Sequence, residues 1–387
     1  MRWDNLRLDD NLAAGQEAGG DAGALFPDGR RDVALPLIER GAVARTFDTP
    51  GFRGMTFYEV HAKSIVNRVP EASRMPFRWT INPYRGCQHS CVYCYARSSH
   101  NYLELDSGAD FDTKVVVKVN APELVHKKMA SPTWPGEHIA MGTNVDCYQR
   151  AEGRYQLMPG IIGALRDAAN PFSILTKGTL ILRDIDLLAE AAEITDVGLN
   201  VSVGFVDKEL WRSVEPGTPA PARRLEACAA LNDRGLRCGV LMGPVVPFLS
   251  DSPAQLEAAV SQIAAAGATH VAPIVLHLRP GTREWFFRWL GAHHPGLVSR
   301  YLALYGRSAY APKSYQAKIS GQIRELADKY GVGRPRPGSG NGRRPEPGRL
   351  APFGIPGPGS RPQADGLAPT PDPPPACPAP SEQLTLL

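Results

Sequence analysis

The stretch NPYRGCQHSCVYCYAR, residues 82–97, places three of the chain's seven cysteines within eight positions. These residues, Cys87, Cys91 and Cys94, have the spacing C-x3-C-x2-C. The residues just before them, FRWTINPY at 77–84, have the apolar and aromatic character of a β-strand. Clustered cysteines in a reduced protein indicate metal binding or catalysis before they indicate disulfides. The stretch therefore predicts a metal or cluster site on a loop that follows a strand.

The alternation of strand and helix continues along the chain. Six strands are expected, at 77–84, 138–144, 171–178, 197–205, 237–246 and 270–279. Helices are expected at 95–104, 159–169, 184–194, 221–234, 253–266 and 283–292, with an additional strand at 114–119 and a closing helix at 315–331. Repeated βα units predict a parallel sheet. Because no Gly-rich phosphate turn follows the first strand, the pattern favours an α/β fold of the partial (β/α)6 TIM-barrel type over an open dinucleotide-binding sheet.

Composition divides the chain into three parts. Residues 1–55 are expected to form a partly disordered N-terminal extension, residues 56–330 the core domain, and residues 331–387 a disordered tail rich in proline and glycine. The sequence has neither a signal peptide nor an apolar run of about 18 residues, so we expect a cytoplasmic protein without membrane contact. A net charge of +4 is too mild to argue for a nucleic-acid partner by itself.

Two kinds of site could use the three cysteines. A structural zinc site takes four ligands, and the sequence offers no second pair of close cysteines. His89 lies between two of the cysteines in a tight loop, which is a poor position for a fourth ligand. Three thiolates instead fit a cubane iron–sulfur cluster with one iron open to another molecule. A zinc-stabilised binding module without turnover remains the alternative outside the enzymes.

The three-cysteine loop after the first barrel strand, with Tyr93 just before the last cysteine, resembles the radical S-adenosylmethionine (radical SAM) enzymes. The resemblance implies that Cys87, Cys91 and Cys94 hold a [4Fe–4S] cluster whose open iron binds S-adenosylmethionine. It also implies reductive cleavage to a 5′-deoxyadenosyl radical, with electrons from an external donor of the flavodoxin or ferredoxin type. Tyr93 would then lie along the adenine, and ordinary packing is its alternative role.

Further stretches resemble one branch of that family, the spore photoproduct lyase and DNA repair photolyase-like proteins, and in particular uncharacterised actinobacterial members. They are residues 62–70, 79–97, 114–124, 141–152, 174–188, 214–225 and 243–251. The resemblance implies a lyase or repair reaction on a nucleic-acid photoproduct. Radical modification of a peptide, a tRNA or a metabolite is the alternative. Glu215 and Arg224, within 214–225, are expected to form a charge pair that orders the loop after the fourth strand.

The resemblance also assigns cosubstrate contacts at the ends of three strands. Thr143, Asn144 and Asp146 match positions that contact the amino group of the methionine moiety, and a strand-to-loop cap is the alternative for them. Lys177 matches a lysine that binds the carboxylate, and a solvated rim charge is its alternative. Ser202 is suited to the ribose or the carboxylate, and a hydroxyl bonded to backbone is its alternative.

The remaining cysteines are scattered. Cys147 lies near the second strand, where the resemblance to spore photoproduct lyase implies a cysteine that returns hydrogen to the product radical. Its alternative role is that of a small, semi-buried hydrophobe. Cys228 and Cys238 are expected in the core, on a helix and a strand respectively. Cys377 lies in the tail and is expected to be an inert, exposed thiol.

Overall fold

A computed structural model describes residues 37–38, 41–71, 73 and 75–333. Its strands are β1 (Val43–Arg45), β2 (Thr56–Val60), β3 (Val66–Arg68), β4 (Trp79–Ile81), β5 (Tyr84–Arg85), β6 (Lys114–Lys118), β7 (Ile139–Met141), β8 (Phe172–Thr176), β9 (Val197–Ser202), β10 (Cys238–Val245) and β11 (Val271–Val275). Its α-helices are α2 (Ala109–Thr113), α3 (Ala121–Met129), α4 (Arg150–Tyr155), α5 (Leu157–Asp167), α6 (Ile185–Ile194), α7 (Lys208–Val214), α8 (Pro221–Asp233), α9 (Pro253–Ala265), α10 (Thr282–His293), α11 (Val298–Tyr305) and α12 (Lys313–Tyr330). Short 3-10 helices are η3 (Pro50–Phe52), η4 (Tyr95–Leu103), η5 (Thr179–Asp184) and η6 (Pro295–Leu297).

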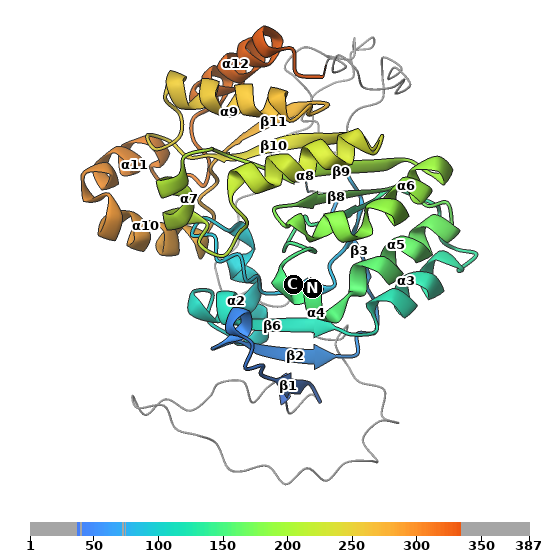
Figure 1. Ribbon diagram of the computed structural model, residues 1–387. Helices are drawn as coiled ribbons and strands as arrows, with labels where there is room; N and C mark the ends of the chain where they lie inside the picture. The colour runs from blue at the N-terminus through green and yellow to red at the C-terminus, as the bar shows by residue number, and fades with distance from the viewer. Residues whose placement is uncertain (1–36, 39–40, 72, 74, 334–387) are drawn as a thin grey trace, which may run out of the picture.

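The main sheet has seven strands in the order β11-β10-β9-β8-β7-β4-β3. Its pairings are parallel from β4 through β11, and β3 pairs with β4 in the antiparallel direction. The six parallel strands correspond to the six predicted βα units and confirm the partial barrel fold (Figure 1). In barrels of this type the active site lies at the carboxyl ends of the strands.

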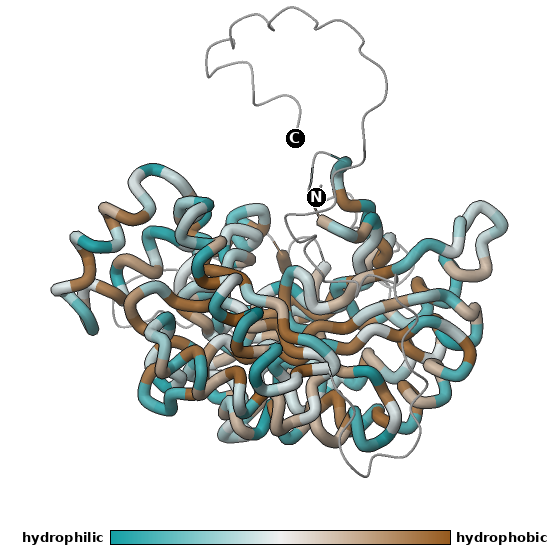
Figure 2. Tube along the Cα trace, turned by 90° about the horizontal axis from the view of Figure 1, so that it is seen from above, coloured by the Kyte–Doolittle hydropathy of each residue, from teal (hydrophilic) through white to brown (hydrophobic). Residues whose placement is uncertain are grey.

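The core lies mainly between the strands and the helices packed on them. Ile139, Phe172, Leu199 and Val240, from four neighbouring strands, are all buried in one large apolar cluster. Figure 2 shows the most hydrophobic residues concentrated along the central strands, with polar residues more frequent on the surrounding helices. Burial of this apolar surface is the main force that holds helices against the sheet.

A second sheet, of order β1-β2-β6-β5, lies beside the main one (Figure 1). The strand predicted at 114–119 is β6, and it pairs with β2 in the parallel direction rather than joining the barrel. The sheet includes β1, which falls within the segment 1–55 that was predicted as an extension, and β1 pairs with β2. Ordered structure thus begins well before residue 56, whereas residues 1–36 and 334–387 lie outside the described part.

Two predicted elements differ from the structure. The single strand expected at 77–84 is divided into β4 in the main sheet and β5 in the second sheet. Pro83 lies between them, and proline cannot donate a ladder hydrogen bond, so pairing stops there. The helix expected at 95–104 is η4, which has 3-10 geometry. No helix in the described residues has the length and apolar character needed to cross a membrane.

Candidate active site

The three predicted cluster cysteines lie on one loop between β5 and η4. The loop starts at Gly86, whose φ is +80°, and a Cβ there would come within 2.6 Å of the Lys114 carbonyl oxygen. Only glycine fits this position without strain. The backbone N–H of Cys87 donates to the Phe111 carbonyl (2.9 Å), and that of Cys94 donates to the Cys91 carbonyl (3.2 Å). The turn is therefore fixed by backbone contacts before any ligand is considered.

Arg97, three residues after the last of these cysteines, holds the loop in place by hydrogen bonds to backbone carbonyls. Its guanidinium donates to the Cys91 carbonyl (3.1 Å) and to the Gly108 carbonyl (2.8 Å). It also forms an ion pair with Asp112 at 2.8 Å. The guanidinium lies 4.7 Å from the centre of the Trp285 ring, a favourable cation–π arrangement. A fully buried arginine with all of these contacts fixes the position of the Cys91 backbone.

All six cysteines in the described residues are free thiols. Cys87 and Cys91 are buried, and Cys94 is half-buried. Burial raises the pKa of all three thiols, an effect that metal coordination opposes because it favours the thiolate. Within the described part of the chain, no three His, Cys, Asp or Glu side chains are placed to share one metal ion. A cubane cluster needs no such convergence, since each cysteine holds a different iron.

Asp146 links the loop after β7 to the end of β8. Its carboxylate accepts hydrogen bonds from the Thr176 hydroxyl (2.6 Å), the Lys177 backbone N–H (2.6 Å) and the Tyr148 backbone N–H (2.8 Å). It also lies 3.4 Å from Nδ1 of His89, in the cysteine loop. Three strong contacts to backbone and hydroxyl groups make this carboxylate a fixed part of the site. Asp146 therefore has the capping role that was its alternative. Contact of Asp146 with the cosubstrate stays a prediction.

Lys177 and Ser202, from the ends of two neighbouring strands, meet at this edge. The Lys177 ammonium donates to the Ser202 hydroxyl (2.9 Å), which in turn donates to the Gly243 carbonyl (2.9 Å). The ammonium lies 3.9 Å from the Glu215 carboxylate. Burial lowers the pKa of Lys177, and the nearby Cys91 opposes that shift. The site therefore offers a cation, a hydroxyl and an anion within one small region.

Tyr93 belongs to a buried polar network. Its hydroxyl donates to Glu215, which also forms an ion pair with Arg224. Arg224 further donates to the Thr218 hydroxyl (2.8 Å) and the Ser202 carbonyl (2.9 Å). The ion pair of Glu215 with Arg224 confirms the predicted pair after the fourth strand. For Tyr93, the hydroxyl is fixed by Glu215, while the Lys177 ammonium lies 5.8 Å from its ring centre. Contact of that ring with an adenine stays a prediction.

The other predicted residues differ in their surroundings. The Thr143 carbonyl, just after β7, accepts a hydrogen bond from the Tyr95 hydroxyl, and Asn144 next to it is half-buried. The Cys147 thiol is buried, and its pKa is raised first by burial and then by the carboxylates of Asp146 and Glu152. Cys147 is therefore an uncharged thiol at neutral pH. Its role as a hydrogen donor stays a prediction.

Cys228 and Cys238 are fully buried, which confirms the prediction that both are core residues. The prediction for Cys377 lies outside the described residues.

The sequence pattern gave no signal for two glutamines that lock the loops together. The Gln88 backbone N–H donates to the Gln149 side chain (3.1 Å), whose amide donates to the Gly86 carbonyl (3.0 Å). The Gln88 side chain accepts from the Ala151 backbone N–H (2.6 Å). These contacts join residues more than sixty positions apart, so only the place of Gln88 within the cysteine motif could have drawn attention to it.

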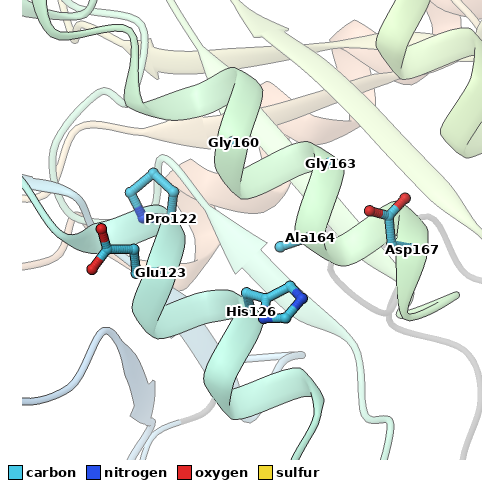
Figure 3. Close-up of a pocket in the computed structure, with 7 residues that line it drawn as sticks. All are labelled: Pro122, Glu123, His126, Gly160, Gly163, Ala164 and Asp167. Atoms are coloured by element: carbon cyan, nitrogen blue, oxygen red, sulfur yellow. The ribbon is translucent and has the colours of Figure 1, made fainter.

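Two pockets in the described part of the molecule are relevant to the location of the site. One, of about 610 Å³, borders the cysteine loop and includes His89, Tyr148 and Gly178 among its lining residues. The other, of about 440 Å³, lies between α3 and α5 (Figure 3). Its walls contain Glu123 and His126 and none of the predicted site residues. The lining of the first pocket contains none of the predicted site residues either. It adjoins the candidate active site because His89 belongs to the cysteine loop and Tyr148 and Gly178 directly follow Cys147 and Lys177.

A partial (β/α) barrel with three cysteines at the carboxyl edge of its sheet defines a cluster-binding enzyme class. The family model for the radical SAM superfamily matches residues 81–256. Uncharacterized proteins of Mycobacterium tuberculosis and Mycobacterium bovis are 50% identical over 309 residues, which is 79% of this chain and 91% of each relative. One from Methanocaldococcus jannaschii is 31% identical over 195 residues, covering 50% of this chain and 69% of that protein. The chain belongs to the radical SAM superfamily.

A solved structure has the same fold. It is a spore photoproduct lyase mutant with bound AdoMet and dinucleoside spore photoproduct, similar at a TM-score of 0.53 and 12% identity. The similarity covers 68% of this chain and 77% of that chain. Radical SAM enzymes bind a [4Fe–4S] cluster and S-adenosylmethionine, and this chain is an enzyme of that kind. The donor set fits both groups, because three thiols on one fixed loop lie beside a half-buried lysine and a buried hydroxyl and carboxylate.

Proposed function

We propose that this radical SAM enzyme is a lyase that acts on a photoproduct in nucleic acid. Cys87, Cys91 and Cys94 would hold the cluster. Lys177 and Ser202 would bind the carboxylate and ribose of S-adenosylmethionine, with Thr143, Asn144 and Asp146 toward its amino group and Tyr93 along its adenine. Bound together, these cofactors supply the radical that abstracts hydrogen from the substrate. An external flavodoxin- or ferredoxin-type protein would supply the electron.

The observation that carries the nucleic-acid substrate is a patch of aromatic and cationic side chains at the mouth of the barrel. We call it the mouth patch: Tyr95, His277, Arg279 and Tyr310. Tyr95 directly follows Cys94, and its hydroxyl reaches the Thr143 carbonyl. Tyr95 and Tyr310 are each 43% exposed, so both rings are accessible to a ligand.

Arg279 connects the two tyrosines of the mouth patch. Its guanidinium lies 5.8 Å from the centre of the Tyr95 ring and donates to the Tyr310 hydroxyl (3.3 Å). The His277 ring packs against Tyr310 edge to face, at 4.7 Å between ring centres. Exposed aromatic rings combined with arginine are the features with which proteins bind unpaired nucleotides. Enzymes that act on a base within a duplex also move it out of the stack into such a site.

Binding of a single-stranded thymidine oligonucleotide tests the mouth patch. Because stacking of one base on an aromatic side chain contributes about 1–3 kcal/mol, Tyr95→Ala or Tyr310→Ala should weaken binding about 5- to 150-fold. Tyr330→Ala, at an exposed tyrosine at the end of α12, is the matched control. Equal affinities for all three variants would contradict the use of the patch for nucleic acid.

Turnover tests the lyase reaction itself. The cluster-loaded, reduced enzyme with S-adenosylmethionine should convert a dinucleoside spore photoproduct to two thymidines. An enzyme that cleaves the cosubstrate but accelerates only with peptide, tRNA or metabolite fractions would support radical modification of those substrates instead.

A further inference from the structure

The two faces of the main sheet differ in composition. Along β8, Phe172 and Ile174 point into the apolar core beneath the helices, and Ser173 points to the opposite, inner face because side chains alternate along a strand. Along β9, Leu199 and Val201 belong to the same core, whereas Asn200 and Ser202 face inward. The inner face of a barrel that serves only as a core is filled by bulky branched residues. In this protein Ser173, Asn200 and Ser202 stand there beside Leu175 and Leu241, so the inner face mixes polar and apolar residues.

Several inner polar groups have no hydrogen-bond partner among the described residues. We call them the inner polar set: Asn82, Ser173, Asn200 and His270. The atoms concerned are Oδ1 of Asn82, Oγ of Ser173, both amide atoms of Asn200 and Nε2 of His270. Buried polar groups are nearly always hydrogen-bonded in folded proteins, so these exceptions mark positions where a ligand or ordered water would supply the missing hydrogen bonds.

Asn200 stands at the centre of this face. It is 2% exposed, and the strand register places it between Leu175 of β8 and Gly239 of β10. A Cβ at Gly239 would come within 2.1 Å of the His270 ring, so that ring lies over Gly239 on the side of Asn200. Ser202, two residues beyond Asn200 on the same face, contacts Lys177. Ser173, Asn200 and His270 therefore lie deeper in the barrel than the groups assigned to the cosubstrate, whereas Asn82 lies at the end of β4.

The charges of the two regions also differ. Lys177, Glu215 and Arg224 are near the strand ends and suit a ligand with an ammonium and a carboxylate. The inner polar set has two amides, a hydroxyl and an imidazole, and burial lowers the pKa of His270 so that its ring is neutral near pH 7. An uncharged set favours an uncharged ligand, because an unpaired ion buried there would lose its hydration.

We infer that Asn200 binds the amide or imide edge of a pyrimidine base, an inference that rests on the proposed nucleic-acid substrate. A primary amide presents a donor and an acceptor side by side, which matches an N–H next to a C=O in a six-membered ring. Paired contacts of this kind are how asparagine recognises bases elsewhere. The His270 imidazole and the Ser173 hydroxyl supply further contacts for the ring's remaining heteroatoms. The phosphates of the substrate would stay outside, at the mouth patch.

Equilibrium binding to the cluster-loaded enzyme tests the inference. The probe is a thymidine dinucleotide, compared with the same dinucleotide methylated at N3, with S-adenosylmethionine saturating. Methylation removes the imide N–H, so binding to the wild-type enzyme should weaken at least about tenfold. Asn200→Leu should reduce that difference to less than about twofold, whereas Asn101→Leu, at an exposed asparagine of η4, should retain it. Iron content and melting temperature establish that each variant is folded.

Three results would overturn the inference. One is equal binding of the two probes to the wild-type enzyme, a comparison that does not depend on how any variant folds. Another is an Asn200→Leu variant that still discriminates between them. The third is loss of probe binding as S-adenosylmethionine is added, which would mean that the cosubstrate itself fills the inner polar set. Failure of photoproduct cleavage with discrimination intact would instead refute the lyase reaction and leave pyrimidine recognition standing.

Discussion

Replacing Arg97 by methionine should destabilise the whole cysteine loop. The guanidinium is fully buried, and the Asp112 carboxylate that it pairs with is only 15% exposed. Removing one partner of a buried ion pair costs about 3–5 kcal/mol, because the other charge is left without compensation. Here the change also removes the two guanidinium nitrogens that donate hydrogen bonds to the Cys91 carbonyl. We therefore expect a loss of about 3–5 kcal/mol in the free energy of unfolding, together with poor cluster loading.

The pH dependence gives this prediction a second signature. Burial raises the pKa of Asp112 to about 6, and Arg97 opposes the shift. Without Arg97 the folded-state pKa rises further above its unfolded value of 3.8. A carboxyl with a raised folded pKa contributes stability at low pH that is lost as pH rises through that pKa. The deficit of Arg97→Met should therefore be smaller at pH 5 than at pH 8.

Urea unfolding of the apoprotein under reducing, anaerobic conditions provides the measurement. The control is Arg223→Met, which removes an exposed pair with Glu226 and should cost less than about 1 kcal/mol. Arg97→Met combined with Asp112→Asn should recover part of the loss, since the uncompensated charge is then gone. A deficit below about 1 kcal/mol for Arg97→Met, equal to that of the control, would refute the anchoring role.

Three further changes have defined outcomes. Burial lowers the pKa of Lys118 to about 7, so the wild-type free energy of unfolding should rise between pH 7 and 10 by up to about 1.4 kcal/mol per pH unit. Lys118→Met should lose that slope in unfolding titrations, and a slope that survives in the variant would disprove the prediction. Glu215→Gln leaves Arg224 buried without its anionic partner and should lower the free energy of unfolding in urea by about 3–5 kcal/mol. A loss under about 1 kcal/mol would contradict this. If Cys147 returns hydrogen to the product, thymidine formed in D₂O should carry solvent deuterium with the wild-type enzyme and not with Cys147→Ala. Mass spectrometry measures the label, and equal label with both enzymes would exclude that role.

The barrel could be predicted because its signals are local. Each βα unit combines a short apolar strand, a turn and a helix, and proline marks the start of two of these helices, at Pro221 and Pro253. Lys177 and Ser202 were assigned to strand ends by the family resemblance, and they meet in the structure because the carboxyl ends of parallel strands share one edge. The cysteine spacing was equally explicit in the sequence.

The second sheet could not be predicted, because β1 and β2 are short and become strands only by pairing with β6. Tertiary pairing of this kind overrides weak local preference. The roles of Arg97 and Gln88 were also hidden, since they depend on which backbone carbonyls and amides become buried. Likewise, the bond from Tyr93 to Glu215 joins residues 122 positions apart. Side chains that serve distant backbone leave no pattern in the sequence.

The central claim is that three cysteines on one loop hold a cluster that activates S-adenosylmethionine. Its most direct test measures iron and 5′-deoxyadenosine in anaerobically reconstituted, reduced protein, for the wild type, Cys91→Ala and the core variant Cys228→Ala. We predict about four irons per chain and release of 5′-deoxyadenosine for the wild type and Cys228→Ala, with both lost in Cys91→Ala. A colourless wild-type protein with stoichiometric zinc, or undiminished release from Cys91→Ala, would contradict it.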